Sequence, residues 1–144
     1  MSPTADLPDL NVWLALTWPA HIHHQHAVRW WEQQAAEQVL FCTTTALGLV
    51  RLVCQPKLMG KAVRTTAEAS ALLDALCQQP GVALAHPEHD GWEVFHQLLR
   101  QGELPVRLCT DAHLAALAMA NGWRLVSFDR DFERFAALER LALP

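Results

Sequence analysis

Short apolar runs alternate along this chain with longer segments of helical periodicity, and this alternation limits the possible folds more than any other feature. The apolar runs have the length of β-strands, about four to six residues, and the segments between them have about ten or more. Strands joined in this way form crossover units, in which neighbouring strands run parallel. The sequence therefore predicts an α/β fold with three layers (α/β/α), in which helices cover both faces of a mainly parallel central sheet.

The apolar pattern also assigns the individual elements. The run from Leu7 to Leu16 begins as a strand and turns into a helix, and the last apolar residues form an edge strand. Thr110 is expected as the N-cap of the last long helix and Gly122 as the residue that ends it. The other expected strands cover residues 39–43, 82–86 and 123–128, and the expected helices cover residues 24–36, 45–54, 66–79, 91–101 and 111–121.

Length and composition place the chain among globular proteins. Its 144 residues predict one domain over residues 1–144, and a hydrophobic content of 51% argues against disorder. No apolar run is long enough to span a membrane, and the first residues lack the pattern of a secretory signal. The four cysteines form no Cys-x-x-Cys motif, so we expect a reduced, cytoplasmic protein.

The charged residues are unevenly distributed along the chain, so the net charge alone does not describe its surface. The formal net charge is −4, which argues against a nucleic-acid partner. However, the segment from Arg51 to Arg64 contains four basic residues and no acidic residue. This segment is either a solvated loop and helix face or a surface that binds a polyanion.

Four aspartates lie where a parallel sheet places its ligands, at the carboxyl ends of the strands. Asp9 comes in or just after the first strand, Asp129 and Asp131 follow the strand at 123–128, and Asp111 lies in the first turn of a helix. Grouped carboxylates repel one another unless a cation neutralises them, and such oxygen ligands suit Mg²⁺ or Mn²⁺. The alternative is that Asp111 only complements its helix dipole and that the other two lie in a surface turn.

In their order along the chain, these segments resemble the PIN-domain ribonucleases, most of all the VapC toxins of bacterial type II toxin–antitoxin modules. The resemblance covers nearly the whole chain, and its motifs are weak singly but strong as an ordered set. They are residues 7–16 (LPDLNVWLAL), 110–118 (TDAHLAALA) and 125–132 (LVSFDRDF), with His24-x-x-Ala27-x-x-Trp30, the run from Leu47 to Leu52, and a short tail from Phe132 to Leu141.

The resemblance implies roles for particular residues. Asp9, Asp111 and Asp129 would be the catalytic and metal-binding acids, with Asp131 as a fourth metal-binding position. Asn11 and Ser127 would support these acids through hydrogen bonds rather than bind metal directly. Each of these roles rests on a separate match to a family motif.

One position departs from the family pattern. Many PIN domains carry a glutamate where this chain has Gly48, and a branch of VapC-like proteins shares the Leu-Gly-x-x-Arg version. The departure leaves open whether the site holds one metal ion or two. Arg51, one helical turn further on, would then reach a phosphate or form an ion pair with an aspartate.

The implied activity is hydrolysis of RNA phosphodiester bonds with Mg²⁺ or Mn²⁺, which needs no protein nucleophile. Arg51, Lys57 and Lys61 are the candidate contacts to the RNA backbone. The family further implies a homodimer and a VapB-like antitoxin that covers the site. Two rivals are a catalytically silent PIN-like module that binds RNA or a partner, and a phosphatase of the haloacid dehalogenase type. The second needs Asp-x-Asp after the first strand, where this chain has Asn11.

The histidine and tryptophan residues are interpreted mainly as structural rather than functional. The cluster His21, His23, His24 and His26 fits no standard zinc pattern, so we expect a solvated helix start. His113 is a weak candidate for a proton shuttle, because helical spacing directs it away from Asp111. The tryptophans that fall on apolar faces are expected in the core or at a dimer interface: Trp30, Trp31, Trp92 and Trp123.

Overall fold

The computed structural model describes residues 4–85, 91–101 and 103–144. Within these residues, five strands form one sheet in the order β3-β2-β1-β4-β5, and every neighbouring pair is parallel. The strands are β1 (Ala5–Pro8), β2 (Gln38–Phe41), β3 (Val82–Leu84), β4 (Arg124–Ser127) and β5 (Arg140–Ala142). The predicted parallel α/β fold is confirmed, and the last apolar residues do form an edge strand.

The strand order decides where a ligand can bind. From β1 the sheet continues through β2 and β3 on one side and through β4 and β5 on the other. Strand order therefore reverses between β1 and β4, and a crevice opens beyond the carboxyl ends of strands at such a point. Asp9 directly follows β1, and Asp129 follows the end of β4 with one residue between them, so the chain brings acids to this crevice from two strands.

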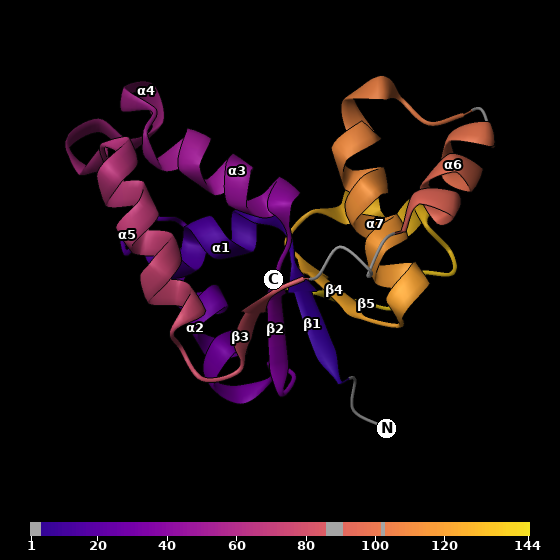
Figure 1. The fold of residues 1–144 in the computed structure, drawn as a ribbon, viewed down its shortest axis with the longest axis horizontal. Coiled ribbons are helices and arrows are strands. Elements are labelled where there is room, and N and C mark those ends of the chain that lie inside the picture. Colours follow the sequence, from indigo (N-terminus) through magenta and orange to yellow (C-terminus); the bar gives the residue numbers. More distant parts are fainter. Residues whose placement is uncertain (1–3, 86–90, 102) are drawn as a thin grey trace.

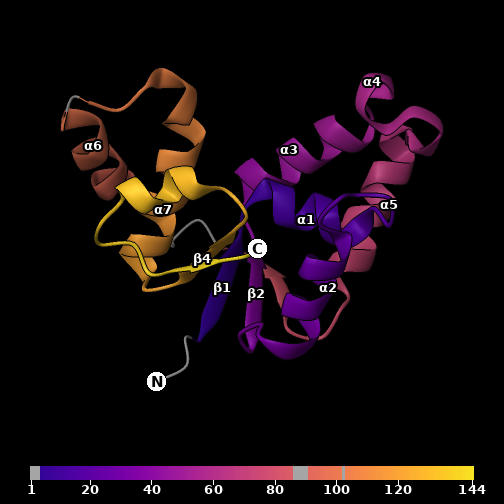
Figure 2. The ribbon, with the colours of Figure 1, turned by 180° about the vertical axis from the view of Figure 1, so that it is seen from behind.

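Helices cover both faces of the sheet (Figures 1 and 2). One face carries α1 (Leu10–Thr17), α2 (His24–Gln33), α3 (Thr43–Val53) and α5 (Thr66–Cys77), and the other carries α6 (Trp92–Arg100) and α7 (Cys109–Asn121). The short helix α4 (Pro56–Met59) follows α3. Three 3₁₀ turns complete the described elements: η1 (Gly60–Ala62), η2 (Val106–Leu108) and η3 (Arg130–Arg134).

Two buried apolar clusters hold these layers together. Successive side chains of a strand point to opposite faces, and Leu125 accordingly packs in the cluster beneath α6 and α7, while Val126 packs in the cluster beneath α1, α2 and α3. In the second cluster the rings of Trp13 and Phe41 stack with centroids 3.8 Å apart. Both halves of the molecule thus pack against a common sheet, which fixes α1 and α7 relative to each other.

Tryptophan placement follows the expectation for the core with one exception. Trp30 and Trp123 are buried, Trp31 is partly buried, and Trp92 is exposed at the start of α6. Trp13, whose place the sequence does not indicate, is fully buried.

A buried ion pair joins β1 to β4 away from the crevice. Asp6 is fully buried and accepts two hydrogen bonds from the guanidinium of Arg124, at 2.7 and 2.9 Å. It also accepts from the indole Nε1 of Trp30 at 3.2 Å and from the backbone N–H of Ala36 at 2.9 Å. The carboxylate therefore links two strands, α2 and the chain that follows α2.

Some predicted boundaries are wrong. Thr110 is not an N-cap: η2 runs directly into α7, which begins at Cys109, so Thr110 is already helical. The strand predicted over 82–86 ends at Leu84, and residue 86 lies outside the described residues. The helix predicted from residue 45 begins at Thr43, because Thr45 bonds back to the N-cap residue Cys42. Gly122 does end α7, with the positive φ of 68° that favours glycine.

None of the helices in the described segments combines the length and the apolar character that crossing a membrane requires.

Candidate metal centre

A cleft of about 430 Å³ opens at the predicted edge of the sheet, between α1 and α3 on one side and α7 on the other. Asp9, Asp111 and Asp129 all line it. These residues come from three distant parts of the sequence, and the crossover topology brings them to one place. The other residues that line the cleft are Leu10, Asn11, Thr44, Thr45, Leu47, Gly48, Arg51, Leu52, Thr110 and Leu114.

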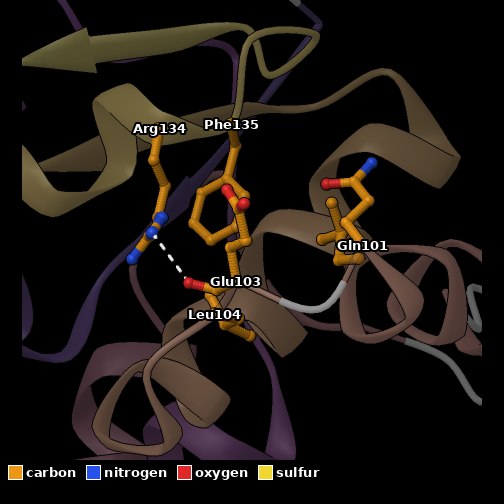
Figure 3. Close-up of a pocket in the computed structure, with 6 residues that line it drawn as sticks. Gln101, Glu103, Leu104, Arg134 and Phe135 are labelled. Atoms are coloured by element: carbon orange, nitrogen blue, oxygen red, sulfur yellow. Dashed lines mark hydrogen bonds between the residues drawn. The ribbon is translucent and has the colours of Figure 1, made fainter.

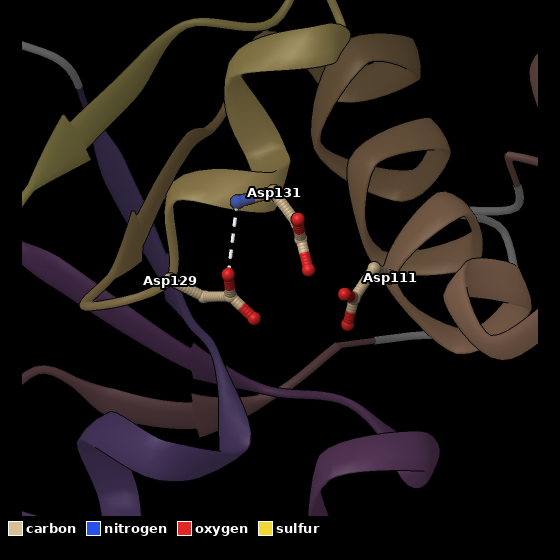
Figure 4. Close-up of side chains that lie close together, drawn as sticks. All are labelled: Asp111, Asp129 and Asp131. Atoms are coloured by element: carbon tan, nitrogen blue, oxygen red, sulfur yellow. Dashed lines mark hydrogen bonds between the residues drawn. The ribbon is translucent and has the colours of Figure 1, made fainter. Parts of the chain in front are cut away.

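Three carboxylates converge at the α7 side of this cleft (Figure 4). One oxygen each of Asp111, Asp129 and Asp131 lies within 4.8 Å of the others. Asp111 projects from the first turn of α7, Asp129 is the N-cap of η3, and Asp131 lies in η3 itself. The backbone N–H of Asp131 donates to Oδ1 of Asp129 at 2.8 Å, so the turn fixes the orientation of that carboxylate.

Ser127, the last residue of β4, connects the acid after β1 to the acid after β4. Its buried hydroxyl donates to Oδ2 of Asp9 at 3.0 Å and accepts from the backbone N–H of Asp129 at 2.9 Å. Oδ1 of Asp9 accepts from the backbone N–H of Leu10 at 2.7 Å, because Asp9 is the N-cap of α1. Asp9 is thus held through both carboxylate oxygens.

The electrostatics of the cluster favour a cation. Burial raises the pKa of Asp111, and the charges of Asp9, Asp129 and Asp131 raise it further, to about 6 from an ordinary value of 3.8. Arg107 opposes this rise. The pKa of Asp9 is raised mainly by burial, although its hydrogen bonds from Ser127 and Leu10 act in the other direction. Repulsion of this kind is relieved by a proton or by a metal ion.

The donor set fits a hard divalent cation. Mg²⁺ takes oxygen ligands at about 2.0–2.1 Å, so two opposite ligands are about 4.2 Å apart. This is the largest oxygen–oxygen distance across such an ion, and the oxygens of Asp111, Asp129 and Asp131, all within 4.8 Å of one another, lie close to that limit. Carboxylates without histidine or cysteine suit Mg²⁺ or Mn²⁺ rather than zinc or copper.

Of the other predicted site residues, some line the cleft and some do not. Asn11 and Arg51 line the cleft with exposed side chains, and Arg51 makes no ion pair within the part of the chain that the structure describes. Lys57 in α4 and Lys61 in η1 are exposed but do not line the cleft. They lie beyond the far end of α3, so they are not brought together with the acids (Figure 1).

Sequence reasoning missed two features of the site. The guanidinium of Arg107 lies 3.2 Å from Oδ2 of Asp131, an exposed ion pair that depends on how η3 docks beside η2 and has no signal in sequence spacing. The second feature is that Leu10, Leu47 and Leu52 line the cleft, which the sequence does not indicate because leucines of an amphipathic helix are expected to face the core.

The histidines singled out in the sequence lie outside this cleft. His24 Nδ1 is 2.7 Å from the carbonyl oxygen of Ala15, and the ring of His23 stacks on Phe128. His113 Nδ1 is 3.4 Å from Oγ1 of Thr44. These side chains support neighbouring elements rather than the acids.

A second, smaller hollow lies between the end of α6 and η3, with a volume of about 180 Å³ (Figure 3). Arg134 spans it and donates to the carbonyl oxygen of Glu103 at 3.4 Å, and Phe135 packs beside them. Among the described residues, Glu103 is the one carboxylate that lines it, so their arrangement here lacks the convergence of acids that marks the larger cleft.

Comparison with known proteins agrees with this arrangement. A family model described as PIN domain matches residues 7–138. Ribonuclease VapC41 of Mycobacterium tuberculosis is 33% identical over 141 residues, which cover 92% of this chain and 94% of that relative. Ribonuclease VapC39 of the same organism is 35% identical over 129 residues, covering 85% of this chain and 87% of that relative.

Solved structures share the fold at lower identity. VapC20 of Mycobacterium tuberculosis, described as a Sarcin-Ricin loop cleaving toxin, has a TM-score of 0.68 at 18% identity and covers 96% of this chain and 99% of its own. VapBC-1 of nontypeable Haemophilus influenzae has a TM-score of 0.68 at 14% identity and covers 96% and 97%. Since the family model and the relatives span most of the sequence, the chain belongs to the PIN-domain family and is VapC-like within it.

Proposed function

We propose that this protein is a metal-dependent endoribonuclease toxin of a VapBC type, acting as one PIN domain over residues 1–144. The observation that carries the proposal is the convergence of Asp111, Asp129 and Asp131 within 4.8 Å in a cleft that Asp9 also lines. Relatives more than 30% identical bear the name ribonuclease, which supports hydrolysis of RNA.

The residues of the chain have separate tasks in this reaction. Asp9, Asp111 and Asp129, with Asp131 beside them, would hold Mg²⁺ or Mn²⁺, and Asn11 would support them from the rim of the cleft. Such a cation polarises the scissile phosphate and lowers the pKa of a water. Ser127 orients two acids through its hydroxyl, and the fixed carboxylates need little rearrangement on binding.

Positive side chains would hold the RNA backbone beside the acids. Arg51 reaches the cleft from α3 without an ion-pair partner in the described segments, so its charge is available to a phosphate. Lys57 and Lys61 continue the positive charge beyond the end of α3, where they would contact phosphates further along the chain.

The proposed partners are an RNA substrate, a VapB-like antitoxin that covers the cleft, and a second copy of the chain in a homodimer. Solved relatives described as VapBC complexes support an antitoxin partner. We place the protein in the cytoplasm, and its four free cysteines fit a reducing compartment.

An RNA cleavage assay tests the proposed activity. Total RNA is incubated with the wild type and with Asp9→Asn, each with Mg²⁺, with Mn²⁺ and with excess EDTA. We expect cleavage by the wild type with either metal, and none with EDTA or with Asp9→Asn. Glu32→Gln, at an exposed position in α2, serves as the control. Equal cleavage by all three proteins would contradict the proposal. Metal binding without any cleavage would favour the silent binding module instead.

The affinity for Mn²⁺ should depend on pH. A metal displaces the proton of a carboxylic acid, and the pKa of Asp111 near 6 keeps it mostly protonated at pH 5 and mostly ionised at pH 7. We therefore expect the apparent affinity to fall at least about tenfold between pH 7 and pH 5. Calorimetric titration at the two pH values measures this change. The same affinity at both would contradict the assignment of Asp111 as a ligand.

Ser127→Ala should weaken metal binding without removing a ligand. Loss of the hydroxyl frees Oδ2 of Asp9 and leaves the backbone N–H of Asp129 without its acceptor. Groups that orient metal ligands typically contribute about 10–100-fold to metal affinity. We expect a loss in that range in Mn²⁺ titrations, while Ser70→Ala, on the exposed face of α5, should bind as the wild type does. An unchanged affinity in Ser127→Ala would argue against this positioning role.

A further inference from the structure

The cleft has two chemically different walls. Asp111, Asp129 and the buried Leu114 line one side, and three leucines of α1 and α3 line the other: Leu10, Leu47 and Leu52. We call these three residues the leucine wall. Leu47 is 53% exposed, although it lines the same cleft as the acids. Because it lines a ligand-sized cleft, this exposed apolar side chain is available to an apolar part of a ligand.

Gly48 allows the leucine wall to lie where it does. A Cβ atom at residue 48 would come within 2.7 Å of Cδ2 of Leu10, too close for the present packing of α1 on α3. Leu10 is the residue after Asp9, and its backbone N–H donates to the Asp9 carboxylate. The wall is therefore tied directly to an acid of the proposed metal centre, and glycine at residue 48 sets its position.

We propose that the leucine wall receives one unstacked nucleobase, from the nucleotide next to the phosphate that is cut. The inference rests on the proposed ribonuclease function. A nucleotide combines a flat, largely apolar base with an anionic phosphate, and the cleft offers leucines for the first and a cation site with Arg51 for the second. A volume of about 430 Å³ is within the range of about 300–1,000 Å³ for small-ligand sites.

This assignment sets a condition on the nucleotide at the cut. In a duplex both faces of a base are covered by its neighbours, so a paired and stacked base cannot lie against the leucines. The nucleotide at the cut must then lie in a single-stranded segment or loop. Leu47 and Gly48 become residues that determine specificity without taking part in the chemistry.

Binding of small probes tests the wall apart from catalysis. With Mn²⁺ present, adenosine 5′-monophosphate and ribose 5-phosphate offer the same phosphate and sugar and differ in the base. We expect the nucleotide to bind the wild type about tenfold more tightly in calorimetric titrations, which is about 1.4 kcal/mol. Leu47→Ser should remove this difference and leave the affinity for ribose 5-phosphate unchanged. Leu84→Ser is the matched control, since Leu84 is equally exposed at 53% but lies on β3 away from the cleft.

A second variant tests the wall without introducing a polar side chain at residue 47. Gly48→Ala adds one methyl group against the flexible end of Leu10 and favours the helix, so the protein should stay folded. It should also reduce the preference for the nucleotide, because Leu10 has to move. If the wild type binds both probes equally, or if Leu47→Ser keeps the full preference, the proposal is wrong.

Cleavage assays separate this inference from the function on which it rests. A single-stranded RNA that the wild type cleaves serves as the substrate. We expect Leu47→Ser to cleave this RNA about tenfold less efficiently than the wild type does. We also expect a complementary strand across the cut site to protect the RNA from the wild type. Metal-dependent cleavage that Leu47→Ser and the complementary strand leave unchanged would overturn the inference but not the function. If Leu47→Ser binds the nucleotide as the wild type does but no longer binds a co-expressed antitoxin, the wall is a contact for a protein, and the inference is wrong.

Discussion

Asp111→Asn is expected to abolish RNA cleavage while making the metal-free protein more stable. The loss of activity should reach at least about 100-fold, the usual effect of removing one electrostatic group from a catalytic site. The gain in stability follows from the pKa of Asp111 near 6, which shows that its negative charge is unfavourable in the fold. Asparagine keeps the shape of the side chain and removes that charge.

The pH dependence of this gain has a definite sign. Between the ordinary pKa of 3.8 and the folded value of about 6, the folded wild type binds more protons than the unfolded chain, so its stability falls as pH rises through this range. Asp111→Asn lacks that fall. At pH 7 with EDTA we expect a gain of about 1 kcal/mol after solvent screening of this partly buried group, and little gain at pH 4.

Thermal melting in EDTA at the two pH values measures the effect, with a difference of about 3 °C expected at pH 7. Asp74→Asn, an exposed position in α5, is the matched control and should change neither melting nor cleavage. A variant Asp111→Asn that is less stable than the wild type at pH 7 would mean that the acid stabilises the fold rather than serving the site.

Arg124→Met is expected to destabilise the protein by about 3–5 kcal/mol, the usual result of removing one partner from a buried ion pair. Asp6 would stay fully buried and lose both guanidinium hydrogen bonds, retaining as donors only Trp30 and Ala36 among those described. Methionine fills much of the same volume, so the effect reports on charge rather than on a cavity.

Urea unfolding measures this loss. Arg140→Met is the control, because Arg140 pairs with the exposed Glu133 at 3.8 Å and such pairs contribute about 0–1 kcal/mol. The double variant Asp6→Asn/Arg124→Met should be less destabilised than Arg124→Met alone, since it buries no uncompensated charge. Equal losses in Arg124→Met and Arg140→Met would contradict the role assigned to this pair.

The sequence predicted the sheet because its two periodicities are local. Apolar runs of strand length and segments of helical spacing identify the elements, and the crossover rule then orders neighbouring strands as parallel. The same rule brings Asp9 and Asp129 to one edge, since each comes just after a strand of this sheet. Their convergence on one cleft also depends on the pairing of β1 with β4, a strand order that the local patterns do not specify.

Other parts of the site depend on tertiary contacts that no spacing encodes. The pairing of Arg107 with Asp131 requires η3 to dock beside η2, and the leucine wall requires α1 to approach α3 at Gly48. Thr110 resembles an N-cap in sequence, but the preceding 3₁₀ turn extends the helix past it. Lys57 and Lys61 are close in sequence to Arg51 but lie in α4 and η1, and they do not line the cleft as Arg51 does.

Calorimetric titration of the metal-free protein with Mn²⁺ at pH 7.5 tests most directly whether the aspartate cluster is a metal centre. Saturable binding is expected in the wild type and in the control Asp74→Asn, with competition by Mg²⁺. Asp129→Asn should lose this binding, because its carboxylate is one of the three within 4.8 Å. Absence of binding in the wild type, or the same affinity in Asp129→Asn, would contradict the proposed metal centre.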